Sequence, residues 1–158
     1  MRYFFIAVAA FGMIVSSIDR SQAQSSTPSI VGVWKINSFV RKEVESGKTS
    51  LPYGEKPSGY RMHTAGGHVS YLFAAADRKA PTGSMTDADR VQFYNTVTAA
   101  VGTYKIDGDK VLFHVDEAAS PGFVGQDATY TFKIEGRALS MATTIGKVEF
   151  LTTYERLE

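Results

Sequence analysis

Gly32-Val33-Trp34 begins the first segment of this chain with strand character, and Arg156 closes the last one. A sheet that closes into a barrel must pair its first strand with its last. A tryptophan near the start of the folded region and an arginine near its end can therefore stack in one closing seam. Such a cation–π contact contributes about 0.5 to 2 kcal/mol. We expect Trp34 and Arg156 to be structural residues of that seam.

Eight segments of the chain have strand character, and short glycine-containing turns join several of them. Ala65-Gly66-Gly67 and Asp107-Gly108-Asp109 are the hairpin signals, and Gly136 and Gly146 separate the last three segments. The expected strands are 31–41, 59–64, 68–74, 102–106, 110–116, 128–135, 138–143 and 148–155. Short strands with hairpin connections favour an all-β fold, here an eight-stranded antiparallel up-and-down barrel.

One short helix is expected between the third and fourth strands. Thr86 followed by Asp87-Ala88-Asp89 has the pattern of an N-cap with an acidic first turn, and apolar residues from Val91 to Val101 recur at helical spacing. A helix at this place either plugs or lids one end of the barrel, or crosses over and covers an open edge of the sheet.

The N-terminus has the organisation of a secretory signal peptide. Met1-Arg2 precedes an apolar run from Tyr3 to Val15, and Ser21-Gln22-Ala23 places small residues at both recognition positions of a signal peptidase. The apolar run is shorter than the roughly 20 residues that span a bilayer. We therefore expect residues 1–23 to be removed and residues 24–158 to form one barrel domain, periplasmic or secreted, with no stable membrane insertion.

Charge and cysteine content exclude several classes of function. The chain has 17 basic and 16 acidic residues, and loss of Arg2, Asp19 and Arg20 with the signal leaves the two signs equal. Nucleic-acid binding needs a basic excess on one face, so we expect no nucleic-acid partner. The chain has no cysteine, which excludes disulfides, zinc–thiolate sites and cysteine nucleophiles.

Several short motifs, taken in order, resemble the bacterial and fungal lipocalin-like domain family. They are Val31-Gly32-Val33-Trp34, Pro57-Ser58-Gly59-Tyr60, Thr64-Ala65-Gly66-Gly67-His68-Val69-Ser70, Gly102-Thr103-Tyr104, Val111-Leu112-Phe113-His114-Val115 and Pro121-Gly122-Phe123-Val124-Gly125. The resemblance covers nearly all of the mature chain. It implies a small eight-stranded barrel, of the calycin type, around a cavity for an apolar or aromatic small molecule, and no single reaction. Where the family tends to carry a basic residue after the Gly125 loop, this chain has Thr129-Tyr130-Thr131.

His114 and Asp116 are the candidate catalytic residues. Residues two apart on a strand share a face, so the carboxylate of Asp116 can orient the imidazole of His114 as a general base. If Leu112 and His114 face inward, the pair lines the cavity. If Val111, Phe113 and Val115 face inward instead, both residues are solvated.

Aromatic residues that share strand faces are the candidate ligand contacts. A tyrosine offers a large apolar body and one hydroxyl group that needs a partner when buried. The set is Tyr60, Met62, Tyr71, Phe73, Tyr104, Tyr130, Phe132 and Phe150. The alternative is an ordinary barrel core with hydroxyl groups at its mouth.

These residues leave two main functions open. The first is an exported protein that binds a small hydrophobic molecule, and the second is a cofactor-independent cyclase, isomerase or hydrolase acting on a phenolic or polyketide-like molecule through His114. A third possibility is a structural module whose interior is filled by side chains. His63 and His68 flank the Gly66-Gly67 turn, but spacing places no third ligand, so we expect no metal site and no cofactor. The sequence leaves a homodimer open.

Overall fold

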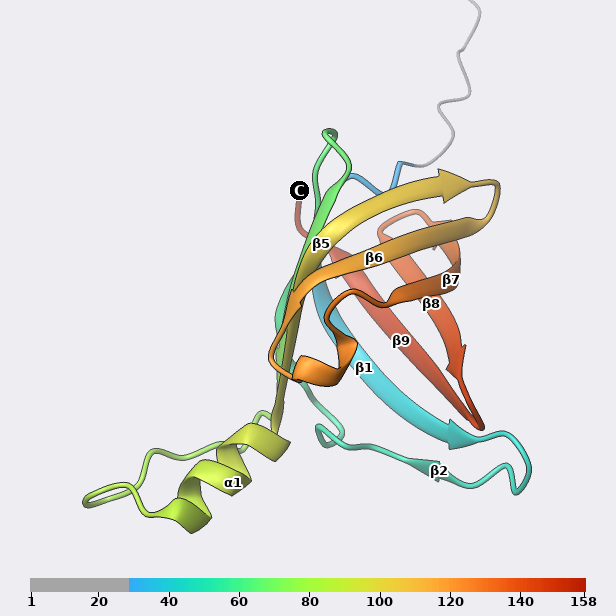
Figure 1. Cartoon of the computed structure of the whole chain (residues 1–158). Coiled ribbons are helices and arrows are strands. Elements are labelled where there is room, and N and C mark those ends of the chain that lie inside the picture. The colour runs from blue at the N-terminus through green and yellow to red at the C-terminus, as the bar shows by residue number, and fades with distance from the viewer. Residues whose placement is uncertain (1–28) are drawn as a thin grey trace, which may run out of the picture.

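The computed structural model describes residues 29–158. The expected signal peptide, residues 1–23, lies outside this range. Eight long antiparallel strands close into a barrel (Figure 1), and a two-residue strand, β2, extends the sheet beside β1. The strands are β1 (Gly32–Glu43), β2 (Thr49–Ser50), β3 (Ser58–His63), β4 (His68–Ala74), β5 (Val97–Asp107), β6 (Lys110–Ala118), β7 (Asp127–Glu135), β8 (Ala138–Ile145) and β9 (Val148–Arg156). The expected fold class is confirmed.

The closing seam pairs β1 with β9, and Trp34 lies directly opposite Arg156. The guanidinium carbon of Arg156 lies 4.1 Å from the centroid of the Trp34 ring. Trp34 is fully buried, and its indole Nε1 donates a hydrogen bond to the carbonyl oxygen of Ile30 at 2.7 Å. Arg156 donates to the carbonyl oxygens of Val31, at 2.8 Å, and Ser29. The predicted stacking of Trp34 on Arg156 is confirmed.

A β-bulge in β1 changes which of its side chains face inward. Ile36 pairs with Tyr154 and Ser38 pairs with Thr153, so Asn37 has no partner of its own on β9. An extra residue on one strand shifts the alternation of side chains by one position. Trp34 and Ile36 therefore face inward before the bulge, and Phe39 faces inward after it. Uninterrupted alternation would have placed Phe39 on the opposite face from Trp34.

Helix α1 (Asp87–Asn95) begins where the sequence predicts but ends earlier. Thr86 caps it in a complete capping box with Asp89, and Thr96 is its C-cap. The stretch 97–101, expected to be helical, instead begins β5 and pairs with β4 and β6. β-branched Val97 and Thr98 favour this extended backbone.

The helix neither lids the barrel nor covers a sheet edge. It extends away from the barrel (Figure 1), none of its residues is buried, and Val91 and Tyr94 are exposed. Closure of β1 on β9 leaves the barrel no open edge there to cover. Both expected roles of the helix are therefore wrong. Within residues 29–158, no helix has the length and apolar character needed to cross a membrane.

Candidate functional site

The interior of the barrel contains a cavity of about 700 Å³. Binding pockets for small organic molecules commonly occupy about 300 to 1,000 Å³, so this volume suits one such molecule. Exposed residues line one end of the cavity: Phe123 of the 3-10 helix η1 (Pro121–Phe123), and Ile145 and Gly146 at the turn between β8 and β9. The cavity therefore opens to solvent between η1 and that turn.

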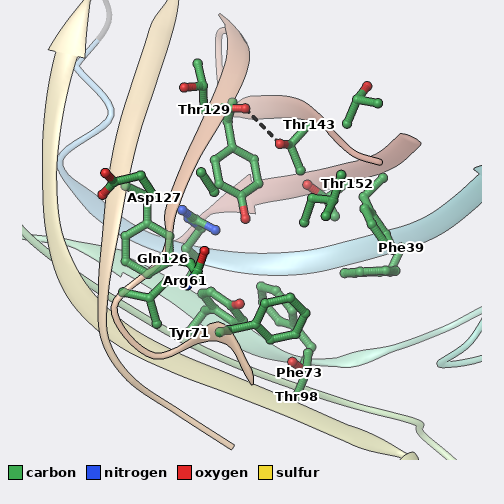
Figure 2. Close-up of a pocket in the computed structure, with 18 of the residues that line it drawn as sticks. Phe39, Arg61, Tyr71, Phe73, Thr98, Gln126, Asp127, Thr129, Thr143 and Thr152 are labelled. Atoms are coloured by element: carbon green, nitrogen blue, oxygen red, sulfur yellow. Dashed lines mark hydrogen bonds between the residues drawn. The ribbon is translucent and has the colours of Figure 1, made fainter. Parts of the chain in front are cut away.

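Aromatic side chains form much of the cavity wall (Figure 2). The rings of Tyr71 and Phe73 are stacked, with centroids 4.9 Å apart and planes 13° apart. The ring centroid of Phe39 lies 6.3 Å from that of Phe73. It also lies 4.9 Å from the centroid of Tyr53 and 5.9 Å from that of Phe150. The cavity thus offers a continuous aromatic surface from β4 to β1 and β9.

Four of the eight candidate ligand contacts line this cavity. They are Tyr71, Phe73, Tyr130 and Phe150. Their role in binding stays a prediction. Burial raises the pKa of Tyr71 well above its ordinary value, so this hydroxyl group keeps its proton and can donate a hydrogen bond.

The placement predicted for Tyr60 and Met62 is wrong. Both residues are exposed on the outer surface of β3, and the inward positions of this strand belong to Arg61 and His63. Residues that face each other across neighbouring strands share a side of the sheet. Arg61 lies opposite Trp34 on β1 and Tyr71 on β4, both of which face inward.

Tyr104 and Phe132 pack in the barrel core and are not among the residues that line the cavity. Tyr104 donates a hydrogen bond from its hydroxyl group to the carbonyl oxygen of Thr64 at 2.8 Å, and its ring makes an edge contact with His63. The prediction that these two rings contact a ligand is therefore not supported by their position.

His114 and Asp116 lie on the outer surface of β6, where about half of each side chain is exposed. Their neighbours Phe113 and Val115 are buried and face inward. Of the two arrangements that the sequence left open, the strand therefore has the one in which His114 and Asp116 are solvated. The nearest carboxylate oxygen to the imidazole is that of Asp127 on β7, at 2.7 Å from Nδ1, whereas Asp116 lies 3.9 Å from Nε2. The pair therefore does not line the cavity, and its catalytic role stays a prediction.

Arg61 is the cavity residue that sequence reasoning missed. Its side chain is 1% exposed, and its guanidinium carbon lies 5.3, 5.7 and 5.1 Å from the ring centroids of Tyr71, Phe113 and Tyr130. Figure 2 shows it among the lining residues, apart from Phe39 across the pocket. A charged residue flanked by Tyr60 and Met62 gives no apolar signal, so alternation of hydrophobicity assigned it to the outside.

His63, the inward neighbour of Arg61 on β3, is neutral. Burial, with a smaller contribution from the charge of Arg61, lowers the pKa of His63 to about 2. The Nε of Arg61 donates to Nε2 of His63 at 3.3 Å, which assigns the imidazole proton to Nδ1. His68, at the other side of the turn, is exposed. Within residues 29–158, no three His, Asp or Glu side chains are grouped so as to hold a metal ion.

Solved structures are similar to this chain at low sequence identity. A lipocalin-like protein from Bacteroides uniformis is 11% identical, with 80% of this chain and 97% of that chain covered at a TM-score of 0.44. An uncharacterized protein from Bacteroides eggerthii is 14% identical (78% and 98% covered, TM-score 0.40), and the wild-type fluorescent protein UnaG is 15% identical (80% and 96% covered, TM-score 0.38). Among curated proteins, none matches this chain significantly.

The family model of the lipocalin-like domain matches residues 31–154. This range begins one residue before β1 and ends two residues before the end of β9, so it includes β1 to β8 in full and most of β9. The seam of Trp34 on Arg156, the eight-stranded closure and this match agree. The chain belongs to the lipocalin-like domain family.

Proposed function

We propose that this chain is exported after removal of residues 1–23 and binds a small hydrophobic or aromatic molecule inside its barrel. The observation that supports the proposal is the cavity of about 700 Å³, which has aromatic walls and opens to solvent at one end. A barrel whose interior served only as a structural core would be filled by side chains, since protein interiors are close-packed.

The expected affinity is modest. Burial of roughly 200 Å² of apolar ligand surface contributes about 5 kcal/mol before the costs of association are subtracted. Two or three hydrogen bonds from groups such as the Tyr71 hydroxyl would bring the dissociation constant to the order of micromolar.

The position of His114 argues against the alternative function, a cofactor-independent enzyme that uses this residue as its acid/base group. The His114 side chain is half exposed on the outer surface, so its imidazole does not face a molecule held inside the barrel. General acid–base catalysis requires the side chain to lie within hydrogen-bond reach of the reacting group. The geometry therefore favours binding over catalysis by the proposed pair.

Titration with a neutral fluorescent probe tests the proposal. N-phenyl-1-naphthylamine is expected to bind the wild-type protein at micromolar concentration. Thr98→Phe inserts a ring into the cavity from β5, and we expect it to weaken binding at least tenfold. Thr103→Phe is the matched control, because Thr103 is an exposed threonine on the same strand.

Circular dichroism checks that both variants fold. A wild-type protein that leaves the probe unbound contradicts the proposal. Equal weakening by Thr98→Phe and Thr103→Phe would show that the probe binds elsewhere, and would also contradict it.

A further inference from the structure

The buried arginine of the cavity has no anionic partner within residues 29–158. None of the ion pairs found in this range includes Arg61, and its Nη2 is buried without a hydrogen-bond partner. Arginine is almost never fully buried unless it is paired, because an isolated charge loses its hydration on burial. The position of Arg61 therefore calls for a partner that the described chain does not supply.

The neighbours of Arg61 reduce the cost of its burial without neutralising its charge. The faces of Tyr71, Tyr130 and Phe113 lie within cation–π range, and each such contact is weaker than a charged hydrogen bond. His63 accepts a hydrogen bond from Nε but carries no negative charge. Nη2 remains a charged donor without a partner, and Arg61 is one of the residues that line a cavity large enough to hold a molecule.

We infer that the molecule bound in this barrel carries an anionic group, most simply a carboxylate, which accepts hydrogen bonds from Arg61 while its apolar body lies against Phe73 and Phe39. This inference rests on the proposed binding function and specifies its ligand class. Hydrogen bonds between a guanidinium and a carboxylate are charge-assisted and often bidentate, which makes such a group a strong anchor.

The aromatic surface begins beside Arg61 and extends away from it, so it is placed to contact an apolar part of the ligand. The ring centroid of Tyr71 lies 5.3 Å from the guanidinium carbon of Arg61, and Phe73 stacks on Tyr71. The ring centroid of Phe39 lies 6.3 Å from that of Phe73, further from Arg61 along the wall. The protonated hydroxyl of Tyr71 is a second donor available to the anionic group. The site thus combines one cationic position with an adjoining aromatic wall.

Two ligands that share one ring system test the inference in the wild-type protein. 9-Anthracenecarboxylate carries the charge, and 9-anthracenemethanol has the same three rings without it. We expect the carboxylate to bind at least tenfold more tightly than the alcohol when ring fluorescence is followed. Equal affinity for the two compounds would overturn the inference and leave the proposed function intact. If neither compound nor N-phenyl-1-naphthylamine binds, the proposed function itself fails.

Variants of Arg61 test whether this residue causes the preference for the carboxylate over the alcohol. Arg61→Met should weaken binding of the carboxylate at least tenfold and leave binding of the alcohol within about twofold, because methionine keeps a long apolar side chain at the position. Arg61→Lys should recover part of the loss. Arg41→Met is the matched control for net charge, because Arg41 is a partly exposed arginine whose ion pair is with Glu43. A preference unchanged in Arg61→Met would overturn the inference.

If Arg61→Met does not fold, the side-chain Nε–H signal of Arg61 in the wild-type protein decides. Its nuclear magnetic resonance shift should change when the carboxylate is added and should stay constant when the alcohol is added. A signal that responds equally to both ligands, or to neither, would contradict a direct contact between Arg61 and the charged group.

Discussion

Arg156→Met is expected to destabilise the barrel, because it removes the guanidinium group from the seam between β1 and β9. Methionine keeps an apolar stem against the Trp34 ring but loses the guanidinium that lies 4.1 Å from it. A half-buried cation–π contact of this kind contributes about 1 kcal/mol. The lost hydrogen bonds from the guanidinium to the carbonyl oxygens of Val31 and Ser29 add about 1.5 kcal/mol between them, a small value for a charged donor because the site is partly exposed.

We therefore expect the free energy of unfolding to fall by about 2 to 3 kcal/mol, which for a domain of this size lowers Tm by about 8 to 12 °C. Urea unfolding can be followed by the fluorescence of Trp34, because it is the one tryptophan of the chain and lies in the seam itself. Arg156→Lys should recover little, since an ammonium group cannot reproduce the planar stacking and forked donors of arginine.

Arg90→Met is the matched control for this change. The Arg90 side chain is 59% exposed on α1 and pairs with an exposed aspartate, so its replacement should change stability by less than about 0.5 kcal/mol. If Arg156→Met also remains within about 0.5 kcal/mol of the wild type, the seam contributes nothing measurable through its arginine and the reasoning is refuted.

Three further changes test the barrel wall. Gly59→Ala places a Cβ about 1.9 Å from the carbonyl oxygen of Leu72 at a φ of +128°, so urea unfolding should show a loss of at least about 3 kcal/mol, whereas Gly83→Ala, with no atom within 4 Å, should be nearly neutral. The pKa of His63 falls from 6.5 to about 2 on folding, so below pH 6.5 the unfolded chain binds a proton that the folded chain does not. The free energy of unfolding should therefore drop by about 1 kcal/mol between about pH 6.5 and 5.5. Unfolding curves of His63→Gln at the two pH values should lack that part of the drop. Phe39→Ala should weaken N-phenyl-1-naphthylamine binding about tenfold and Tyr60→Ala should not; the reverse order would contradict the assignment of inner and outer faces.

The closure of the barrel could be predicted from the sequence because its signals are strong and local. Glycine turns mark the hairpins, and Trp34 and Arg156 are each recognisable at one end of the folded region. The end of α1 could not be fixed in the same way. Residues 97–101 are apolar at positions that fit either a helix or a strand, and pairing with β4 and β6 decides for the strand.

The inner face of the barrel was harder to predict than its strands. The bulge at Asn37 reverses the alternation of β1 without any glycine or proline to mark it, which is why Phe39 was not among the expected ligand contacts. On β6 the apolar residues Val111, Phe113 and Val115 face inward, as hydrophobicity alone favours.

The failure on β3 has a different cause and carries more information. Alternation could not locate Arg61, because the rule assumes that apolar side chains face inward, and here Tyr60 and Met62 are exposed while a cation is 1% exposed. The pairing of Arg61 with Trp34 and Tyr71 imposes this arrangement on the strand. Departures from the hydrophobic pattern cost stability, and proteins retain them chiefly where function requires them. The guanidinium of Arg61 also reaches the face of Tyr130 on β7, so inward-facing residues of three strands hold this cation in place.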